Sequence, residues 1–218
     1  MPHAPKTSLE RIMKRMPERR ARALCRPAIA FPLLLLAGAA VAHPGHGDGG
    51  FAAGFVHPFL GADHLLAMVA MGLWIALLPG PRARVAAGAG LLGLMVAGVL
   101  VGAFTVAAGT PVPAVLESAL ASTVVASGAL LALHRGVRRP IAFAVLGACA
   151  LLHGFAHGAE AFGSSLAAFG GGFLAATVVL QSVGLVAGSW LARTRALGWR
   201  VAGTAIGAAG VVLLASRL

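Results

Sequence analysis

Apolar residues fill long stretches of the chain, separated by short interruptions rich in proline, glycine or arginine. A helix needs about 20 apolar residues to cross a hydrocarbon core of ~30 Å, because it rises ~1.5 Å per residue. After residue 50 the pattern predicts six such spans, at residues 52–78, 85–108, 112–134, 140–162, 165–192 and 198–216. The expected fold class is therefore all-α, a polytopic transmembrane helix bundle.

The overall composition agrees with membrane insertion. Of the 218 residues, 59% are hydrophobic and 11% are charged, and the mean hydropathy is +0.90. Soluble domains carry about 25% charged residues. GxxxG spacings, which allow helices to approach closely, occur at Gly98/Gly102, Gly154/Gly158, Gly184/Gly188 and Gly203/Gly207. We therefore expect a compact bundle of lipid-embedded helices.

The first 50 residues differ from the rest. Residues 1–26 are polar and basic, and residues 27–42 form a short apolar stretch that ends in Ala40-Val41-Ala42. This order is typical of a secretory signal peptide, so we predict residues 1–42 to be a signal peptide cleaved after Ala42. The alternative is an uncleaved first helix. Residues 43–50 would then form an external segment, and residues 51–218 the six-helix membrane domain.

The distribution of basic residues predicts the orientation. The formal charge is +11, but eight of the 17 basic residues precede Pro27 and most others lie in short loops, which argues against a nucleic-acid-binding face. The loops after the first, third and fifth spans carry Arg82, Arg84, Arg135, Arg138, Arg139, Arg193, Arg195 and Arg200. By the positive-inside rule these loops are cytoplasmic and the mature N-terminus is external. Arg217 alone lies on the external side.

Ionisable side chains inside the spans are few, and by default such residues mark a functional site. The first span contains His57, Asp63 and His64, and the fourth contains His153, His157 and Glu160. Both groups fall in the external half of the bilayer. The three residues of the fourth span, at i, i+4 and i+7, share one helix face. His57 and His64 share a face if the first span is continuous, which Pro58 puts in question.

Three further polar residues have more than one interpretation. Glu117, near the start of the third span, either joins this group or caps its helix. Gln181, inside the fifth span, is expected to link helices, and His134 is expected to be a loop residue at the cytoplasmic edge.

The histidines and carboxylates of the first and fourth spans suit nickel, zinc, copper or iron(II), and no thiolate or thioether set indicates copper(I). We predict a metal or proton site, in which Asp63 or Glu160 either binds the metal or orients a ligating histidine.

Two motifs resemble those of a known family. His57-Pro58-Phe59-Leu60-Gly61-Ala62-Asp63-His64 resembles the HPxxGxDH signature of the HupE/UreJ family, and His153-Gly154-Phe155-Ala156-His157-Gly158-Ala159-Glu160 resembles its HGxxHGxE signature. The resemblance implies a bacterial inner-membrane permease for nickel, or for cobalt, that serves hydrogenase or urease maturation. It implies that the six polar residues of the two motifs are critical for transport. Glu117 resembles a recurrent family position, whereas many relatives carry histidine in place of Gln181.

The predicted function is therefore non-enzymatic: inward transport of Ni²⁺ or Co²⁺, with no tightly bound cofactor. The metal ion and the lipid bilayer are the expected partners, and a homo-oligomer and an indirect link to hydrogenase or urease metallation are compatible with the sequence. GxxxxGK[ST] is absent, so a secondary carrier or channel-like permease is favoured over an ATP-driven pump. An intramembrane metal-dependent hydrolase is the main alternative, because the same ligands hold zinc and activate water. A bis-histidine haem protein is a third.

The segment after the predicted cleavage site suggests an accessory site. Cleavage would place a free α-amino group beside the imidazole of His43, with His46 and Asp48 close by in sequence. Both the amine and the imidazole become available to a metal around neutral pH. We predict that His43 and His46 capture metal outside the membrane, and the alternative is a solvated segment with no such role.

Overall fold

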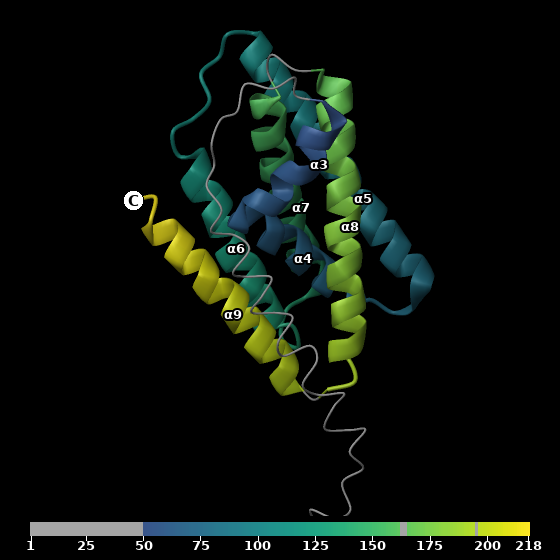
Figure 1. The fold of residues 1–218 in the computed structure, drawn as a ribbon. Helices are drawn as coiled ribbons and strands as arrows, with labels where there is room; N and C mark the ends of the chain where they lie inside the picture. The colour runs from purple at the N-terminus through teal and green to yellow at the C-terminus, as the bar shows by residue number, and fades with distance from the viewer. Residues whose placement is uncertain (1–49, 162–164, 195) are drawn as a thin grey trace, which may run out of the picture. The chain divides into compact units, whose positions relative to one another are not determined.

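The computed structural model describes residues 50–161, 165–194 and 196–218, which belong to one compact unit. These residues form seven helices and no strand (Figure 1). The helices are α3 (Phe51–Leu60), α4 (Ala62–Ala76), α5 (Gly80–Ala107), α6 (Leu116–Ala132), α7 (Arg139–Glu160), α8 (Leu166–Leu191) and α9 (Ala196–Ala215). The all-α prediction is thus confirmed. The predicted signal peptide and the segment with His43 and His46 lie outside the described residues.

Four helices, α5, α7, α8 and α9, are long and apolar enough to cross a membrane, and the bent pair α3 and α4 makes five if it counts as one span. Helix α6 has 17 residues and is about 26 Å long, slightly shorter than a hydrocarbon core. The predicted third span, residues 112–134, is therefore longer than the helix observed. Pro111 and Pro113 precede α6, and a proline keeps the residue before it out of helical conformation.

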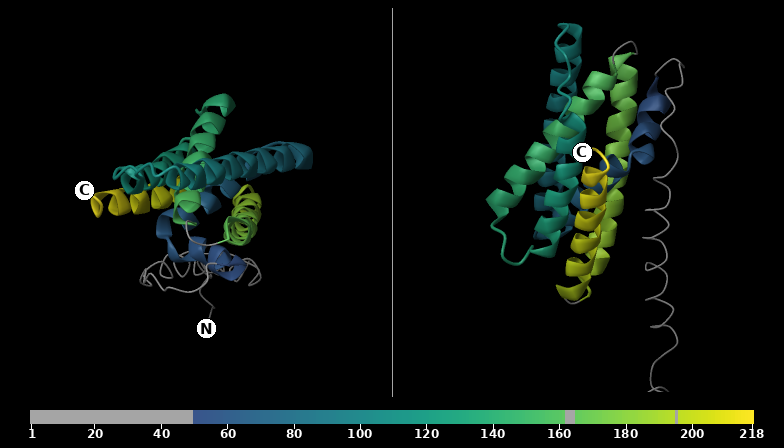
Figure 2. Two further views of the ribbon diagram at one scale, coloured as in Figure 1. Left: turned by 90° about the horizontal axis from the view of Figure 1, so that it is seen from above. Right: turned by 90° about the vertical axis from the view of Figure 1, so that its left-hand side faces the viewer.

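The predicted first span, residues 52–78, is broken into two helices, so the continuity that Pro58 put in question is absent. Helices α3 and α4 meet at an angle of 87°, and the views in Figure 1 and Figure 2 show them running in different directions. The break lies at Gly61, which has extended backbone, while Pro58 lies inside α3. A Cβ on Gly61 would lie 2.9 Å from Nδ1 of His64 and 3.1 Å from Oδ1 of Asp63. A side chain at this position would therefore press on the hydrogen-bonded pair Asp63 and His64.

Glycines bring the helices into direct backbone contact, as the GxxxG spacings predicted. Helix α5 packs against α7, where Gly98 and Gly102 face the backbone of residues 151–159, and Gly154 and Gly158 face the backbone of residues 95–99. Helix α4 packs against α8 in the same way, at Gly72 and Gly184. A Cβ at any of these glycines would collide with a backbone atom of the partner helix. Small residues at such contacts replace the hydrophobic driving force that is missing in lipid.

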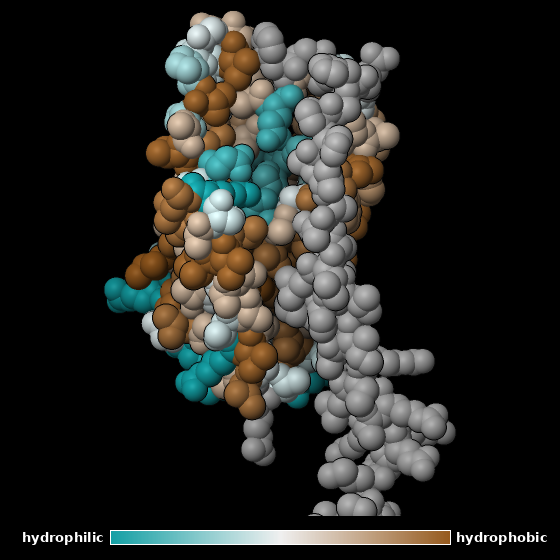
Figure 3. Space-filling view, turned by 60° about the vertical axis from the view of Figure 1, so that its left-hand side comes forward, coloured by the Kyte–Doolittle hydropathy of each residue, from teal (hydrophilic) through white to brown (hydrophobic). Residues whose placement is uncertain are grey.

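Large apolar side chains cover much of the outer surface. Phe104, Val186 and Leu133, on or next to three different helices, are all exposed. Figure 3 shows one face of the molecule as largely hydrophobic, with hydrophilic residues gathered in a patch within it and at its lower end. Extended exposed apolar surface marks a contact with another apolar phase. With helices of this length and composition, that phase is the lipid bilayer, and the chain is a multi-pass membrane protein.

Charged side chains gather at two opposite ends of the helices. One end, here called the arginine end, carries Arg82, Arg84, Arg135, Arg138, Arg139, Arg193 and Arg200 near the ends of α4, α6 and α8 and the starts of α5, α7 and α9. There, Arg84 donates hydrogen bonds of 3.1 Å to the carbonyl oxygens of Ala76, the last residue of α4, and of Leu78. Basic side chains commonly bind the last carbonyl groups of a helix in this way. The other end, the histidine end, carries Asp63, Glu117, Glu160 and Arg217. These three carboxylates are all the acidic side chains of the described residues.

The helix contacts predict a sharp difference between two glycines of α5. In Gly98→Ala the new Cβ would collide with the carbonyl of Leu151 on α7, whereas nothing lies within 4 Å of a Cβ on Gly93. We expect Gly98→Ala to destabilise the protein by about 1–3 kcal/mol, the usual cost of overpacking. Thermal melting in detergent measures the difference. Gly93→Ala is the control, and equal melting temperatures for the two variants would contradict the packing argument.

Candidate metal site

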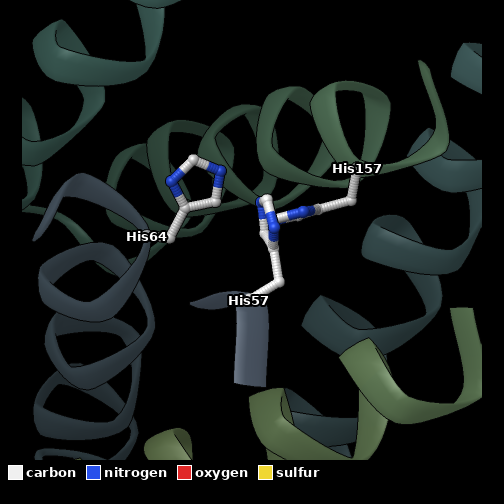
Figure 4. A group of neighbouring side chains, drawn as sticks. All are labelled: His57, His64 and His157. Carbon is white, nitrogen blue, oxygen red and sulfur yellow. The ribbon is translucent and has the colours of Figure 1, made fainter. Parts of the chain in front are cut away.

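Three histidines from three helices converge at the histidine end. One ring nitrogen each of His57 on α3, His64 on α4 and His157 on α7 lies within 4.8 Å of the other two (Figure 4). His64 and His157 are buried and His57 is partly exposed. Neutral imidazoles are common ligands of nickel, zinc, copper and iron. The geometry of this trio therefore suits a metal ion.

The break at Gly61 is what brings His57 into this trio. In one continuous helix, residues seven apart are separated by about 10 Å along the axis. The ring centroids of His57 and His64 are only 5.9 Å apart, and those of His57 and His157 are 4.8 Å apart. The shared face expected for a continuous first span is thus replaced by a closer arrangement, in which α3 turns back over the start of α4.

Asp63 orients His64. Its Oδ1 accepts hydrogen bonds from Nδ1 of His64 at 2.5 Å and from the backbone N–H of His64 at 2.8 Å. The carboxylate is almost completely buried, with 1% of the residue exposed. Since Nδ1 of His64 is engaged, Nε2 is the atom left for a ligand, and it has no hydrogen-bond partner among the described residues. A carboxylate that fixes the tautomer of a histidine is a common accompaniment of metal ligation.

The two histidines of α7 also present nitrogen atoms that lack partners. Nδ1 of His153 lies 2.9 Å from the carbonyl oxygen of Cys149, so it carries the proton and Nε2 has the free lone pair. The ring of His153 lies 5.1 Å from that of His64, and the ring of His157 lies 4.4 Å from it. Nε2 of His153 and both ring nitrogens of His157 are buried without a hydrogen-bond partner in the described part of the chain. Buried nitrogens of this kind are costly unless something satisfies them, and a bound cation would satisfy those that present a lone pair.

Glu160, the last residue of α7, closes the cluster on its outer side. Its Oε2 lies 2.9 Å from Nε2 of His57 and 3.4 Å from Nδ1 of His157. The side chains of Glu160 and His57 are 42% and 37% exposed, whereas His64, His153 and His157 are buried. His153, His157 and Glu160 lie on one face of α7, as their spacing implies. The open side of the cluster is formed by His57 and Glu160.

The other polar residues named from the sequence lie outside the histidine trio. Glu117 is exposed at the start of α6, and its Oε2 lies 3.3 Å from Nη1 of Arg217. His134 lies beyond α6 at the arginine end, where Nδ1 is 3.0 Å from the carbonyl oxygen of Leu131 and the ring contacts Trp199. Gln181 joins α8 to α4 through a 3.8 Å contact between Nε2 and the sulfur of Met71, as expected for a helix link.

Two features of the site have no local signal in the sequence. Arg217, which follows α9, places Nη1 2.9 Å from Oδ2 of Asp63. Beyond the histidines, two thioether sulfurs, those of Met68 and Met95, lie 3.6 and 3.4 Å from the hydroxyl of Thr177. Met68 and Met95 are 27 positions apart in the sequence, and their spacing gives no sign of this grouping. The residues joined by these contacts are 82 or more positions apart along the chain, and they meet only through tertiary packing.

Together, the fold and the site define a multi-pass helical membrane protein with a histidine cluster able to hold a metal ion. A family model described as HupE / UreJ protein matches residues 31–213. The chain is 40% identical over 192 residues to Protein HupE of Rhizobium leguminosarum bv. viciae. The match covers 83% of this chain and 93% of the relative. The chain therefore belongs to the HupE/UreJ family, as its two motifs predicted. No solved structure matches it.

The site predicts that loss of one imidazole weakens metal binding. In His157→Ala we expect nickel affinity to fall by about tenfold or more, because loss of a group that only orients a ligand already costs about 10–100-fold. Calorimetric titration of Ni²⁺ into the purified protein measures this. His134→Ala, at the opposite end, is the matched control. Equal affinities in the two variants would contradict a site at His57, His64 and His157.

Proposed function

We propose that the protein is a permease that moves nickel, or cobalt, inward across the bacterial inner membrane. The observation that carries the proposal is the convergence of His57, His64 and His157, with buried ring nitrogens that lack partners in the described residues. Membership of the HupE/UreJ family and the similarity to a HupE protein support a role connected with nickel. The metal ion is the transported substrate and not a resident cofactor.

The exposure of the cluster suggests how an ion reaches it. His57 and Glu160 are the partly exposed members, so the ion would first meet a carboxylate and an imidazole and then the buried His64 and His157. By the positive-inside rule the arginine end is cytoplasmic, which makes the histidine end external. The entry side therefore faces the source of the metal.

The proposed topology counts six spans, with α3 and α4 as one broken span and α6 as a short one.

The region beyond the cluster is filled with side chains. The ring of Phe173 lies 3.9 Å from that of His157, and Phe173, Met68, Met95 and Thr177 are fully buried. An ion that leaves His157 toward the arginine end would have to displace these side chains. These contacts support a state that is accessible from the histidine end and closed toward the other. A membrane potential of 100 mV contributes about 2.3 kcal/mol per elementary charge to inward movement, so a dication needs no separate energy source in this scheme.

The N-terminal segment completes the proposal on the external side. Cleavage after Ala42 would leave His43 at the N-terminus with His46 three residues away. An α-amino group and an imidazole on one residue chelate a metal together once both are deprotonated. We propose that this segment raises the local metal concentration when metal is scarce.

Uptake in cells that express the protein tests transport directly. We expect Asp63→Asn and Glu160→Gln to lower the accumulation of radioactive nickel by about tenfold, because each loses a group that positions a metal-binding histidine. His134→Ala should take up nickel like the wild type. Immunoblots of membrane fractions control for the amount of protein. An intramembrane hydrolase would instead give no metal-dependent uptake even for the wild type, and that result would overturn the permease proposal.

The proposed orientation makes a separate prediction. Reporter fusions near Arg82, Arg138 and Arg193 should be active only in the cytoplasm, and fusions near Thr110 and at residue 163 only outside. Alkaline phosphatase and green fluorescent protein report the two compartments. A cytoplasmic signal at residue 163 would place Glu160 and the histidine cluster on the wrong side for capture of external metal.

A further inference from the structure

Arg217 is an exception to the charge pattern of the molecule. Among the described residues, the other arginines lie at the arginine end, and no lysine is present there or elsewhere. Arg217 lies instead just beyond the end of α9, at the histidine end. A basic residue on the external side opposes the positive-inside rule. The structure gives this residue a specific set of partners.

One nitrogen of Arg217 meets three oxygen atoms from two helices. Nη1 lies 2.9 Å from Oδ2 of Asp63 and 3.3 Å from Oε2 of Glu117, and it donates a 2.7 Å hydrogen bond to the carbonyl oxygen of Glu117. Three oxygens around one positive nitrogen resemble the surroundings of a bound cation. Arg217 thus supplies a permanent positive charge beside the buried carboxylate of Asp63.

The ion pair links Arg217 to the metal cluster through Asp63. Oδ1 of Asp63 holds Nδ1 of His64, and Oδ2 faces Arg217. A carboxylate buried to this extent is costly unless it is paired. Oδ1 is thus hydrogen-bonded to the histidine that faces the cluster, and Oδ2 forms an ion pair with the arginine behind it but has no hydrogen-bond partner among the described residues.

The side-chain charges of the described residues at the histidine end sum to a value that matches a dication. Three carboxylates (Asp63, Glu117 and Glu160) and one guanidinium (Arg217) carry a formal charge of −2, since no other Asp, Glu, Lys or Arg of the described residues lies there. Imidazoles that bind a metal are neutral. A bound dication would therefore bring the histidine end to zero. Without Arg217 the formal charge would be −3, and the end would stay negative after the ion had bound.

We propose that Arg217 is a tethered counter-ion that sets the charge of the histidine end at −2 and thereby limits its affinity for a divalent cation. The proposal rests on the proposed function and adds a determinant of affinity to it. A conducting site must bind an ion strongly enough to admit it and weakly enough to release it. A fixed positive charge next to Asp63 weakens the attraction for a dication without removing any ligand.

Nickel binding by the purified full-length protein tests the effect on affinity. We expect Arg217→Gln to bind Ni²⁺ about fivefold more tightly or better, a typical size for coupling between two sites, and Arg217→Lys to stay close to the wild type. Arg200→Gln, which removes an arginine from the other end of α9, is the matched control and should bind like the wild type. Unchanged or weaker binding in Arg217→Gln would overturn the proposal.

A second measurement needs no metal and separates this proposal from the proposed function. In metal-free protein, Arg217→Gln should lower the melting temperature because Asp63 loses its partner, and the same change made in an Asp63→Asn background should lower it much less. Equal losses in both backgrounds would overturn the counter-ion role. A wild type that shows this coupling but does not bind or transport nickel would instead overturn the proposed function and leave the Arg217–Asp63 pair established.

Discussion

The buried carboxylate of Asp63 is the constraint on which the histidine end depends. A charge removed from water is tolerated only when partners replace its hydration, and here they come from two directions: His64 on Oδ1 and Arg217 on Oδ2. Asp63 also lies in the first turn of α4, where the positive end of a helix dipole favours a negative charge. One carboxylate thus ties the start of α4 to the chain end beyond α9, and fixes His64 in the orientation that leaves Nε2 free.

The break at Gly61 makes this first turn available. If α3 and α4 were one helix, Asp63 would lie in a helix interior, without free backbone N–H groups near it. His57 would then be about two turns away from His64. The 87° bend gives α4 a new N-terminus within the apolar part of the bundle. Discontinuous helices in membrane proteins often place such helix ends at ion or substrate sites. The same bend brings His57 to the face of α7 that carries His157.

Local pattern was enough to predict the fold class and, to within about two residues, the ends of α7, α8 and α9. It also singled out His57, His64 and His157, which the structure brings together. Hydropathy marks α5, α7, α8 and α9, and an i, i+4, i+7 spacing defines one face of α7 whatever its neighbours are. The sequence pointed to Pro58 as the place of a kink, because proline is a strong helix breaker. The structure instead keeps Pro58 inside α3 and breaks the helix at Gly61, which has extended backbone. The missing side chain at Gly61 leaves space for the side chains of Asp63 and His64. The Arg217–Asp63 pair joins residues 154 positions apart, and no local pattern predicts such a contact.

The packing of the helices limits how a path to the arginine end can open. Glycine contacts bring α5 into backbone contact with α7, and α4 into backbone contact with α8, so separating the members of either pair would expose close-packed backbone. His64 of α4 and His157 of α7 lie on different pairs, and Phe173 of α8 packs against His157. We therefore expect any opening to occur by movement of the α4–α8 pair relative to the α5–α7 pair, as in transporters whose halves move as units. A metal ion bound to both pairs at once would hold them together, and the loss of its contacts with one pair would be the event that lets them part.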